Sequence, residues 1–212
     1  MVLALDEDAA EQLRDCIASG GVAVFPSDTV YGVCCDPENE DATRRLYALK
    51  GRPHARSCAV MFFDVEEALD QLDDLHDAER DAIQALLPGP VTLLLANRNQ
   101  RFAPACRVDP STVGLRVPEL SGRLAPLARV GVPVLQSSAN LSGEPDARRL
   151  DDVPARLRDG ADLVIDGGEL AGTPSTVIDL RDLDPDGRWY VLREGALPRD
   201  SVEHALGALV RG

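Results

Sequence analysis

Lysine is almost absent from this chain. Of its 22 basic residues only Lys50 is a lysine, and it stands at a predicted helix end in the segment Ala48–Pro53. An ammonium is a compact point charge that phosphate oxygens approach from any direction, whereas a guanidinium is a planar fork. Lys50 is therefore a candidate phosphate-binding residue. Its chance survival during a drift toward arginine is the alternative that its position alone leaves open.

The chain also lacks the features of membrane, disulfide-bonded and metal-binding proteins. No run approaches the roughly 18 apolar residues that cross a bilayer, and the first residues are acidic where a signal peptide needs positive charge. The five cysteines include no Cys-x-x-Cys pair, and no His-x-x-x-His pair occurs. We expect a soluble, cytoplasmic protein without membrane contact, without a protein-held metal, and with Cys34 and Cys35 as packed thiols.

Aromatic residues are scarce, at 4%, and the formal net charge is −14. A surface of this charge repels a nucleic-acid backbone, and so few aromatic side chains provide no evident platform for stacking bases. We therefore predict weak or no direct RNA binding. Any anionic ligand must meet a local cluster of positive charge.

The hydrophobic pattern predicts strands interleaved with helices, which is typical of an α/β domain. The predicted strands cover residues 22–25, 59–63, 91–96, 113–117, 132–135, 163–165, 176–180 and 189–192, and the predicted helices 6–19, 41–49, 65–72, 77–87, 120–129, 153–158 and 201–210. The closely spaced late strands indicate antiparallel pairs as well. We expect a single domain over residues 1–212, with residues 141–152 as a mobile surface loop.

Polar residues follow the first predicted strand. Ser27–Gly32 offers hydroxyl, carboxylate and phenol groups where a strand opens into a loop, and Thr29 is a candidate pocket residue. A turn stabilised by Asp28 and Gly32 is the alternative.

Positive charge gathers at two places. Lys50, Arg52 and Arg56 lie within seven residues and predict an anion clamp, with a solvated basic loop as the alternative. Arg116 stands inside an apolar strand, where it needs a carboxylate or phosphate partner. A ligand site and a structural salt bridge are both open for it.

The segment Ser137–Gly143 offers small hydroxyl and amide groups that approach phosphates closely. Neither Gly-x-x-x-x-Gly-Lys-Ser/Thr nor Gly-x-Gly-x-x-Gly is present. A nucleotide would therefore be held by a less familiar cradle.

Six blocks, in this order, resemble those of the YrdC-like family, and they span about residues 20–195. They are Pro26–Gly32, Lys50–Pro53, Pro88–Thr92, Gly114–Pro118, Ser138–Gly143 and Ser175–Asp179. The resemblance implies a twisted, mixed parallel and antiparallel α/β sheet with flanking helices around a concave, positively charged cavity, similar to dihydroxybutanone-phosphate synthase.

The resemblance also implies an enzyme, the nucleotidyltransferase L-threonylcarbamoyladenylate synthase. It would convert L-threonine, bicarbonate and ATP, with Mg²⁺, into threonylcarbamoyl-AMP and pyrophosphate for the t6A modification of tRNA at position 37. The chain resembles the short, single-domain type, which works with separate tRNA threonylcarbamoyl transferase proteins. Two alternatives are a paralogue acting as an RNA-binding module without synthase activity and a carbamoyl-transfer domain like that of hydrogenase maturation factors.

Positions within the blocks imply the site residues. Lys50 and Arg52 would be catalytic, facing the triphosphate and the developing carbamate. The residues implied for threonine are Thr29, Arg116 and Ser175, and those implied for ATP are Lys50, Arg52, Arg56, Thr112, Ser138, Asn140 and Arg193. Ser57-Cys58 and Met61 depart from the family's pattern, which usually has Pro-Leu and in some relatives a histidine near threonine.

Overall fold

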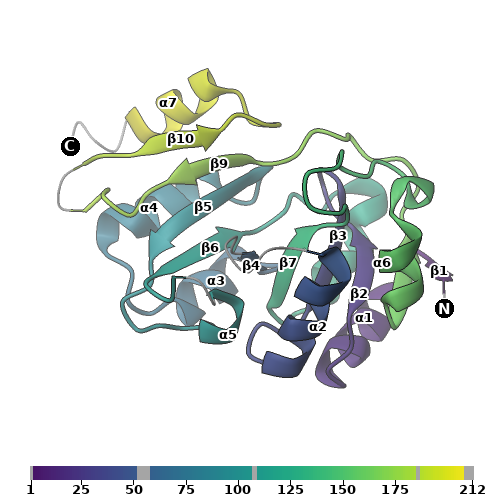
Figure 1. Ribbon diagram of the computed structural model, residues 1–212. Coiled ribbons are helices and arrows are strands. Elements are labelled where there is room, and N and C mark those ends of the chain that lie inside the picture. The colour runs from purple at the N-terminus through teal and green to yellow at the C-terminus, as the bar shows by residue number, and fades with distance from the viewer. Residues whose placement is uncertain (1, 52–57, 107–108, 185–186, 208–212) are drawn as a thin grey trace.

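The centre of the computed structural model, which describes residues 2–51, 58–106, 109–184 and 187–207, is a mixed sheet (Figure 1). The strand order in the described chain is β1-β8-β2-β3-β7-β4-β6-β5-β9-β10. The strands are β1 (Val2–Ala4), β2 (Ala23–Pro26), β3 (Tyr31–Cys35), β4 (Ala59–Met61), β5 (Val91–Ala96), β6 (Thr112–Arg116), β7 (Val134–Ser138), β8 (Leu163–Asp166), β9 (Thr176–Asp179) and β10 (Tyr190–Arg193). Strand β4 runs parallel to β6 and antiparallel to β7, so the predicted mixed sheet is confirmed.

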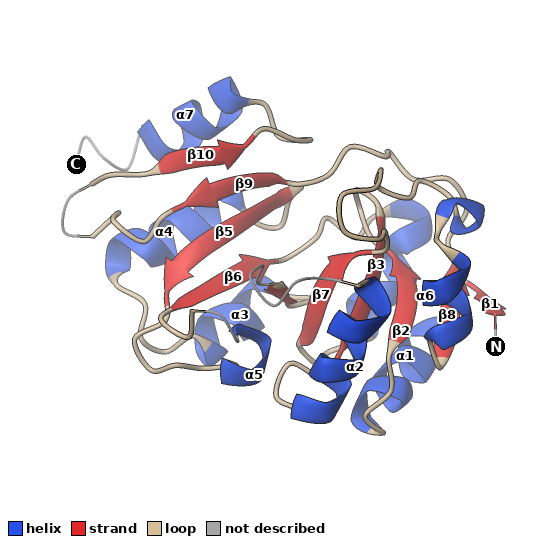
Figure 2. Cartoon of the chain, viewed as in Figure 1, coloured by secondary structure: helices blue, strands red, loops and turns tan. Residues whose placement is uncertain are grey.

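Helices flank this sheet (Figure 2). They are α1 (Ala9–Ala18), α2 (Glu40–Lys50), α3 (Val65–Gln71), α4 (Asp77–Leu86), α5 (Ala103–Cys106), α6 (Ala155–Gly160) and α7 (Arg199–Gly207), with 3₁₀ segments η1 (Gly122–Arg129) and η2 (Leu150–Asp152). No helix among the described residues is long and apolar enough to span a membrane.

Helix α2 is bounded by two local signals, and its end matters for the site. The Asn39 side chain accepts a hydrogen bond from the Ala42 amide at 3.0 Å, which caps the first turn. Gly51 follows the last residue with a φ of 57°, a left-handed conformation that glycine adopts without a steric penalty. The helix therefore ends at Lys50, and it is this stop that fixes where the only lysine leaves the backbone.

Side chains on alternate positions of the strands enter different environments. In β5, Leu93 and Leu95 are fully buried in the larger core cluster, while Thr92 and Leu94 between them are only half-buried. The smaller core cluster joins side chains of α1 to strand residues that include Met61 and Val134. In a strand such as β5, every second side chain therefore packs in the core, and the side chains between them are available to line a cavity.

Most predicted elements are confirmed, with differences that have physical reasons. Strands β1 and β3 and helix α5 were not predicted, because β1 has only three residues, β3 carries Gly32 and two cysteines, and α5 is one turn long. The predicted helix 120–129 is a 3₁₀ segment that contains Pro126. The strand predicted at 132–135 instead runs from 134 to 138, and residues 208–210 of the last predicted helix lie outside the described residues.

The predicted surface loop at 141–152 is confirmed for residues 141–149, which contain turns and bends and are mostly exposed, but the segment is held to the rest of the fold at several points. Ala147 is buried, and its carbonyl accepts a hydrogen bond from the Tyr31 amide at 3.0 Å. Arg148 and Arg149 both pair with Glu169, and residues 150–152 form η2. The polar composition of the segment does not indicate this hydrogen bond and these ion pairs, because the partner residues lie far away in the sequence.

Candidate functional site

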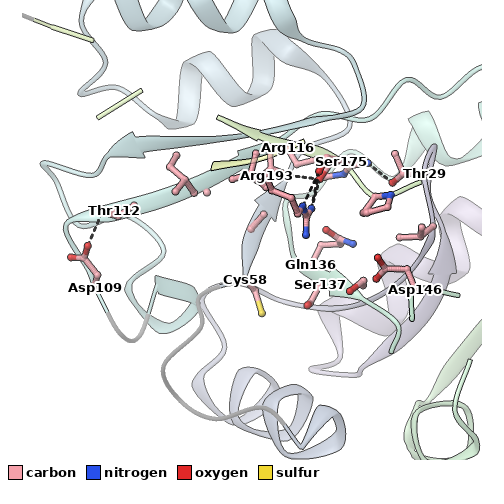
Figure 3. A pocket seen from close by; sticks show the side chains of 18 residues that line it. Thr29, Cys58, Asp109, Thr112, Arg116, Gln136, Ser137, Asp146, Ser175 and Arg193 are labelled. Atoms are coloured by element: carbon pink, nitrogen blue, oxygen red, sulfur yellow. Dashed lines mark hydrogen bonds between the residues drawn. The ribbon is translucent and has the colours of Figure 1, made fainter. Parts of the chain in front are cut away.

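A cavity of about 330 Å³ lies against the central strands (Figure 3). Its walls come from the loop after β2, from strands β4, β5, β6 and β7, and from the segments around β9 and β10. Small-molecule sites in proteins start at about this size. The cavity is therefore large enough for a small polar ligand.

The floor of the cavity is one cross-strand row whose two central residues are small. Gln136 of β7 pairs with Ala59 of β4, Ala59 pairs with Gly114 of β6, and Gly114 pairs with Leu94 of β5. A Cβ atom built on Gly114 would lie 3.3 Å from the Ala59 Cα. Glycine at 114 therefore permits the close approach of β4 and β6, and the row leaves space above it.

Arg116 occupies one end of the cavity and is only 2% exposed. Its Nη2 donates to the Asp28 carboxylate in an ion pair and to Thr29 Oγ1 at 2.9 Å. Burial lowers the pKa of the Arg116 guanidinium. The neighbouring Asp28 charge raises this pKa, but the effect of burial is larger. The salt bridge considered for Arg116 is therefore present, and it lies in the wall of a cavity.

A second guanidinium stands near the first. Arg193 donates from Nη2 to the Ser175 carbonyl at 2.8 Å and to Ser175 Oγ at 3.2 Å, and Ser175 Oγ lies 2.9 Å from Thr92 Oγ1. Repulsion by Arg193 contributes to the lowered pKa of Arg116. Two like charges in one wall favour an anion between them. Arg193, implied for ATP, thus lies with Ser175 and Arg116, which are implied for threonine.

Lys50 is linked to the cavity wall through Ser138. Its side chain is buried, and Nζ donates to the Ser138 carbonyl and, at 3.3 Å, to Asn140 Oδ1. Ser138 Oγ donates to the same Asn140 oxygen at 2.7 Å, and Asn140 Nδ2 donates to the Glu144 carbonyl at 2.6 Å. The structure therefore brings Lys50, Ser138 and Asn140 into one cluster, of which Ser138 lines the cavity.

Thr112 lines the cavity on the side of β6. Its hydroxyl donates to Asp109 Oδ2 at 2.7 Å and accepts from Arg181 Nη1 at 3.4 Å. The hydrogen bonds from Ser111 and Thr112 lower the pKa of Asp109, which keeps this carboxylate charged.

Six of the predicted site residues line the same cavity, namely Thr29, Thr112, Arg116, Ser138, Ser175 and Arg193. Lys50 and Asn140 join them through Ser138. Arg52 and Arg56 lie outside the described residues. In the described lining, Arg116 and Arg193 are balanced by Asp109 and Asp146, so the positive excess implied by the family resemblance is not found in this part of the wall.

Sequence reasoning missed Gln136, Asp146, Asp109 and Thr92 as cavity residues, along with Cys58. The period of two along a strand would have placed Gln136 on the face of Ser138, had the strand been predicted to reach residue 138. Met61 is fully buried in the smaller core cluster and does not line the cavity. The departure at Met61 therefore affects core packing on the strand next to Arg116, with which Met61 pairs in register.

The predicted packing of the cysteines is confirmed for Cys34 and Cys35, which are fully buried. Burial raises the pKa of Cys35 to about 12 and that of Cys106 to about 11. A nucleophilic cysteine needs a lowered pKa, so these thiols are inert at neutral pH. Among the described residues no group of three His, Cys, Asp or Glu side chains could hold a metal ion.

Comparisons with known proteins point to one family. A family model, Sua5_yciO_yrdC with the description "Telomere recombination", matches residues 15–195. The chain is 27% identical to the threonylcarbamoyl-AMP synthase of Bacillus subtilis, over 98% of this chain and 59% of that protein. It is 32% identical to the threonylcarbamoyl-AMP synthase of Marinobacter nauticus, over 79% of this chain and 88% of that protein.

A solved structure is similar over nearly the whole chain. P. abyssi Sua5 complexed with L-threonine superposes with a TM-score of 0.84 at 26% identity, over 98% of this chain and 61% of that one. The chain thus spans about three fifths of the Bacillus and P. abyssi proteins and most of the Marinobacter protein.

The buried ion pair yields a prediction for stability. Asp28→Asn keeps the shape of the side chain but leaves the Arg116 guanidinium, with 3% of its side chain exposed, without a counter-charge. We expect the free energy of unfolding to fall by about 3 to 5 kcal/mol in denaturant titration. Asp41→Asn, in an ion pair with Arg44 whose Asp41 side chain is 89% exposed, is the control and should change it by no more than about 0.5 kcal/mol. Equal effects of the two substitutions would contradict this reading.

Proposed function

This chain belongs to the Sua5/YciO/YrdC family, and we propose that it is a threonylcarbamoyl-AMP synthase. Such an enzyme converts L-threonine, bicarbonate and ATP into threonylcarbamoyl-AMP and pyrophosphate, which makes it a nucleotidyltransferase. One observation carries the proposal: a single cavity is lined by a buried guanidinium with hydroxyl groups at one place and at another by Ser138, which is hydrogen-bonded to Lys50 and Asn140. Two relatives of the chain bear the name of this synthase.

The Arg116 region is suited to an amino acid. A guanidinium holds a carboxylate by charge-assisted hydrogen bonds. The Thr29 and Ser175 hydroxyls beside it offer partners for the hydroxyl group of threonine. The related P. abyssi Sua5 has been solved with L-threonine bound. We assign Arg116, Thr29 and Ser175 to threonine, and Arg193 adds positive charge beside its carboxylate.

The cluster at Lys50 is suited to a nucleotide. Lys50 contributes a buried positive charge, and its bonds to the Ser138 carbonyl and the Asn140 amide oxygen fix the strand-to-loop turn at that position. Preorganised charge in a partly buried site stabilises a developing anion without later reorganisation. We assign Lys50, Ser138 and Asn140 to the phosphates and Thr112 to the rest of the nucleotide. Arg52 and Arg56, the other two predicted members of the clamp, stay predictions.

Positioning and electrostatics account for the reaction. The threonine amine forms a bond to the carbon of bicarbonate, and the hydroxide that leaves takes an amine proton to become water. A carbamate oxygen then attacks the α-phosphorus of ATP, and pyrophosphate leaves. Arg116 holds the amino acid while the Lys50 charge stabilises the phosphate side, so both reactants are fixed in one chamber.

Mg²⁺ fits this site as an ion that arrives with ATP. Mg²⁺ in nucleotide sites is held by phosphate oxygens, waters and one or two carboxylates, so a cage of three protein ligands is not needed. Asp109 is occupied by the hydroxyls of Ser111 and Thr112, whereas the Asp146 carboxylate makes no hydrogen bond within the described residues. Asp146 would therefore hold the ion, which would neutralise charge on the phosphates.

The product has an onward use that also belongs to the proposal. Threonylcarbamoyl-AMP is a mixed anhydride, and its activated carbonyl suits transfer to an amine. We propose that tRNA threonylcarbamoyl transferase proteins consume it in the cytoplasm for the t6A modification of tRNA.

A substrate panel tests the activity. Purified protein is mixed with ATP, Mg²⁺, bicarbonate and one amino acid at a time, and pyrophosphate release is measured. We expect threonine to exceed valine by at least about tenfold in kcat/KM, because valine leaves the hydrogen-bonding groups near Thr29 unpaired. Equal rates with threonine and valine, or no release with any amino acid, would rule out the synthase.

Lys50 provides a second test. Lys50→Met keeps most of the aliphatic stem and removes the charge, so we expect kcat for pyrophosphate release to fall by about 100- to 1,000-fold. Arg44→Met on the same helix removes an exposed cation and should leave kcat unchanged. Unfolding curves of both variants identify any loss of folded protein. A Lys50→Met variant that is folded and as active as the wild type would refute the assignment of Lys50.

A further inference from the structure

Gln136 is a buried polar residue whose carboxamide has no hydrogen-bond partner among the described residues. It stands in the middle of β7, is 7% exposed and lines the cavity. Its carboxamide makes no hydrogen bond within the part of the chain that the structure describes, and Figure 3 shows it projecting into the cavity. The amide atoms face the cavity, so their donor and acceptor are available to a ligand, and a ligand that excludes water there must supply both hydrogen bonds or leave them unmade at a cost.

The register of the sheet places Gln136 between the two ends of the cavity. Arg116 pairs with Met61, and Met61 with Val134, two residues before Gln136 in β7. Ser138, the cavity residue bonded to Asn140, lies two residues after it. Two residues along a strand span about 7 Å. The amide therefore occupies the row between Arg116 and Ser138.

The surrounding residues leave room for both the amide and a ligand. A Cβ atom at Gly32 would lie 2.8 Å from Gln136 Nε2, so glycine at position 32 gives the amide its place. Ala59 and Gly114, the next two members of the same cross-strand row, have almost no side chain. A small planar group can therefore lie on the floor in front of the amide.

We propose that Gln136 binds the group formed from bicarbonate, the carbamate of threonine, and fixes it between the two reactants. This proposal rests on the proposed synthase activity. A carboxamide offers one donor, Nε2–H, and one acceptor, Oε1, side by side. The carbamate presents the complement, an oxygen that accepts and an N–H that donates. When the threonine amine bonds to the bicarbonate carbon and water leaves, the carbamate oxygen and N–H form above the row of Gln136, Ala59 and Gly114.

Binding in this orientation has a chemical consequence. One carbamate oxygen is held by Nε2–H, and the other is left to attack the α-phosphorus on the side of Ser138 and Lys50. Gln136 is neutral, so it selects the carbamate by hydrogen bonding and leaves the charge balance of the cavity unchanged.

Gln136→Met tests the proposal, because methionine has nearly the same shape and neither donor nor acceptor. With ATP and threonine saturating, pyrophosphate release is measured against bicarbonate concentration in carbonate-free buffer. We expect the KM for bicarbonate to rise by about tenfold or more, which is the scale of one lost hydrogen-bonding group, while the KM for ATP changes less than about threefold. Gln12→Met on α1, at a half-buried position outside the cavity, is the control for the chemical change and should leave all KM values unchanged.

Each outcome decides a different claim. If the wild type releases no pyrophosphate, both the proposed synthase activity and the proposed role of Gln136 are wrong. If the wild type is active and Gln136→Met keeps the wild-type KM for bicarbonate, or raises the KM for ATP as much, only the role of Gln136 is overturned. Should Gln136→Met not fold, Gln136→Glu takes its place, since a carboxylate of the same size repels the carbamate and must raise the bicarbonate KM by more than tenfold. An unchanged KM in Gln136→Glu overturns the proposal as well.

Discussion

The buried ion pair between Arg116 and Asp28 is the constraint on which the cavity depends. Arg116 belongs to β6, and Asp28 lies in the loop that follows β2. Strands β3, β7 and β4 stand between β2 and β6 in the sheet, so the two would be about 19 Å apart if the sheet were flat. Direct contact therefore requires a curved sheet and a loop that reaches over it. The same contact places Thr29 and a guanidinium in the wall of the resulting hollow.

The chemistry follows from how charge is distributed in an acidic chain. A protein of net charge −14 binds an anion only where guanidinium or ammonium groups are concentrated. Arg193, beside the ion pair of Arg116 and Asp28, is one such place, and Lys50 at the end of α2 is another. Between them the row of Ala59 and Gly114 carries no charged side chain. An amino acid and a nucleotide can therefore be bound at separate positions with their reacting groups meeting over the floor.

The sequence reveals much of this arrangement, and the parts that it conceals have definite causes. Arg116 was identifiable because an arginine inside an apolar strand needs a partner, but its partner Asp28 is 88 residues away and left no local signal. Ser138 and Asn140 were identifiable as a polar segment after a strand, whereas Gln136 was not, because cavity and core faces alternate along a strand whose register depends on distant neighbours. The missed strand β3 carries Gly32, whose role is a close approach to Gln136 that only the folded sheet shows.

The central claim is that one cavity receives ATP and an amino acid together, and thermal unfolding with ligands tests it most directly. ATP with Mg²⁺ should raise the Tm, and L-threonine with bicarbonate should raise it further, because each ligand stabilises the folded state that binds it. A generic RNA duplex should leave the Tm unchanged at physiological salt, since a protein this acidic neutralises few phosphates. A rise with the duplex and none with ATP, with or without threonine, would contradict the account and favour an RNA-binding module.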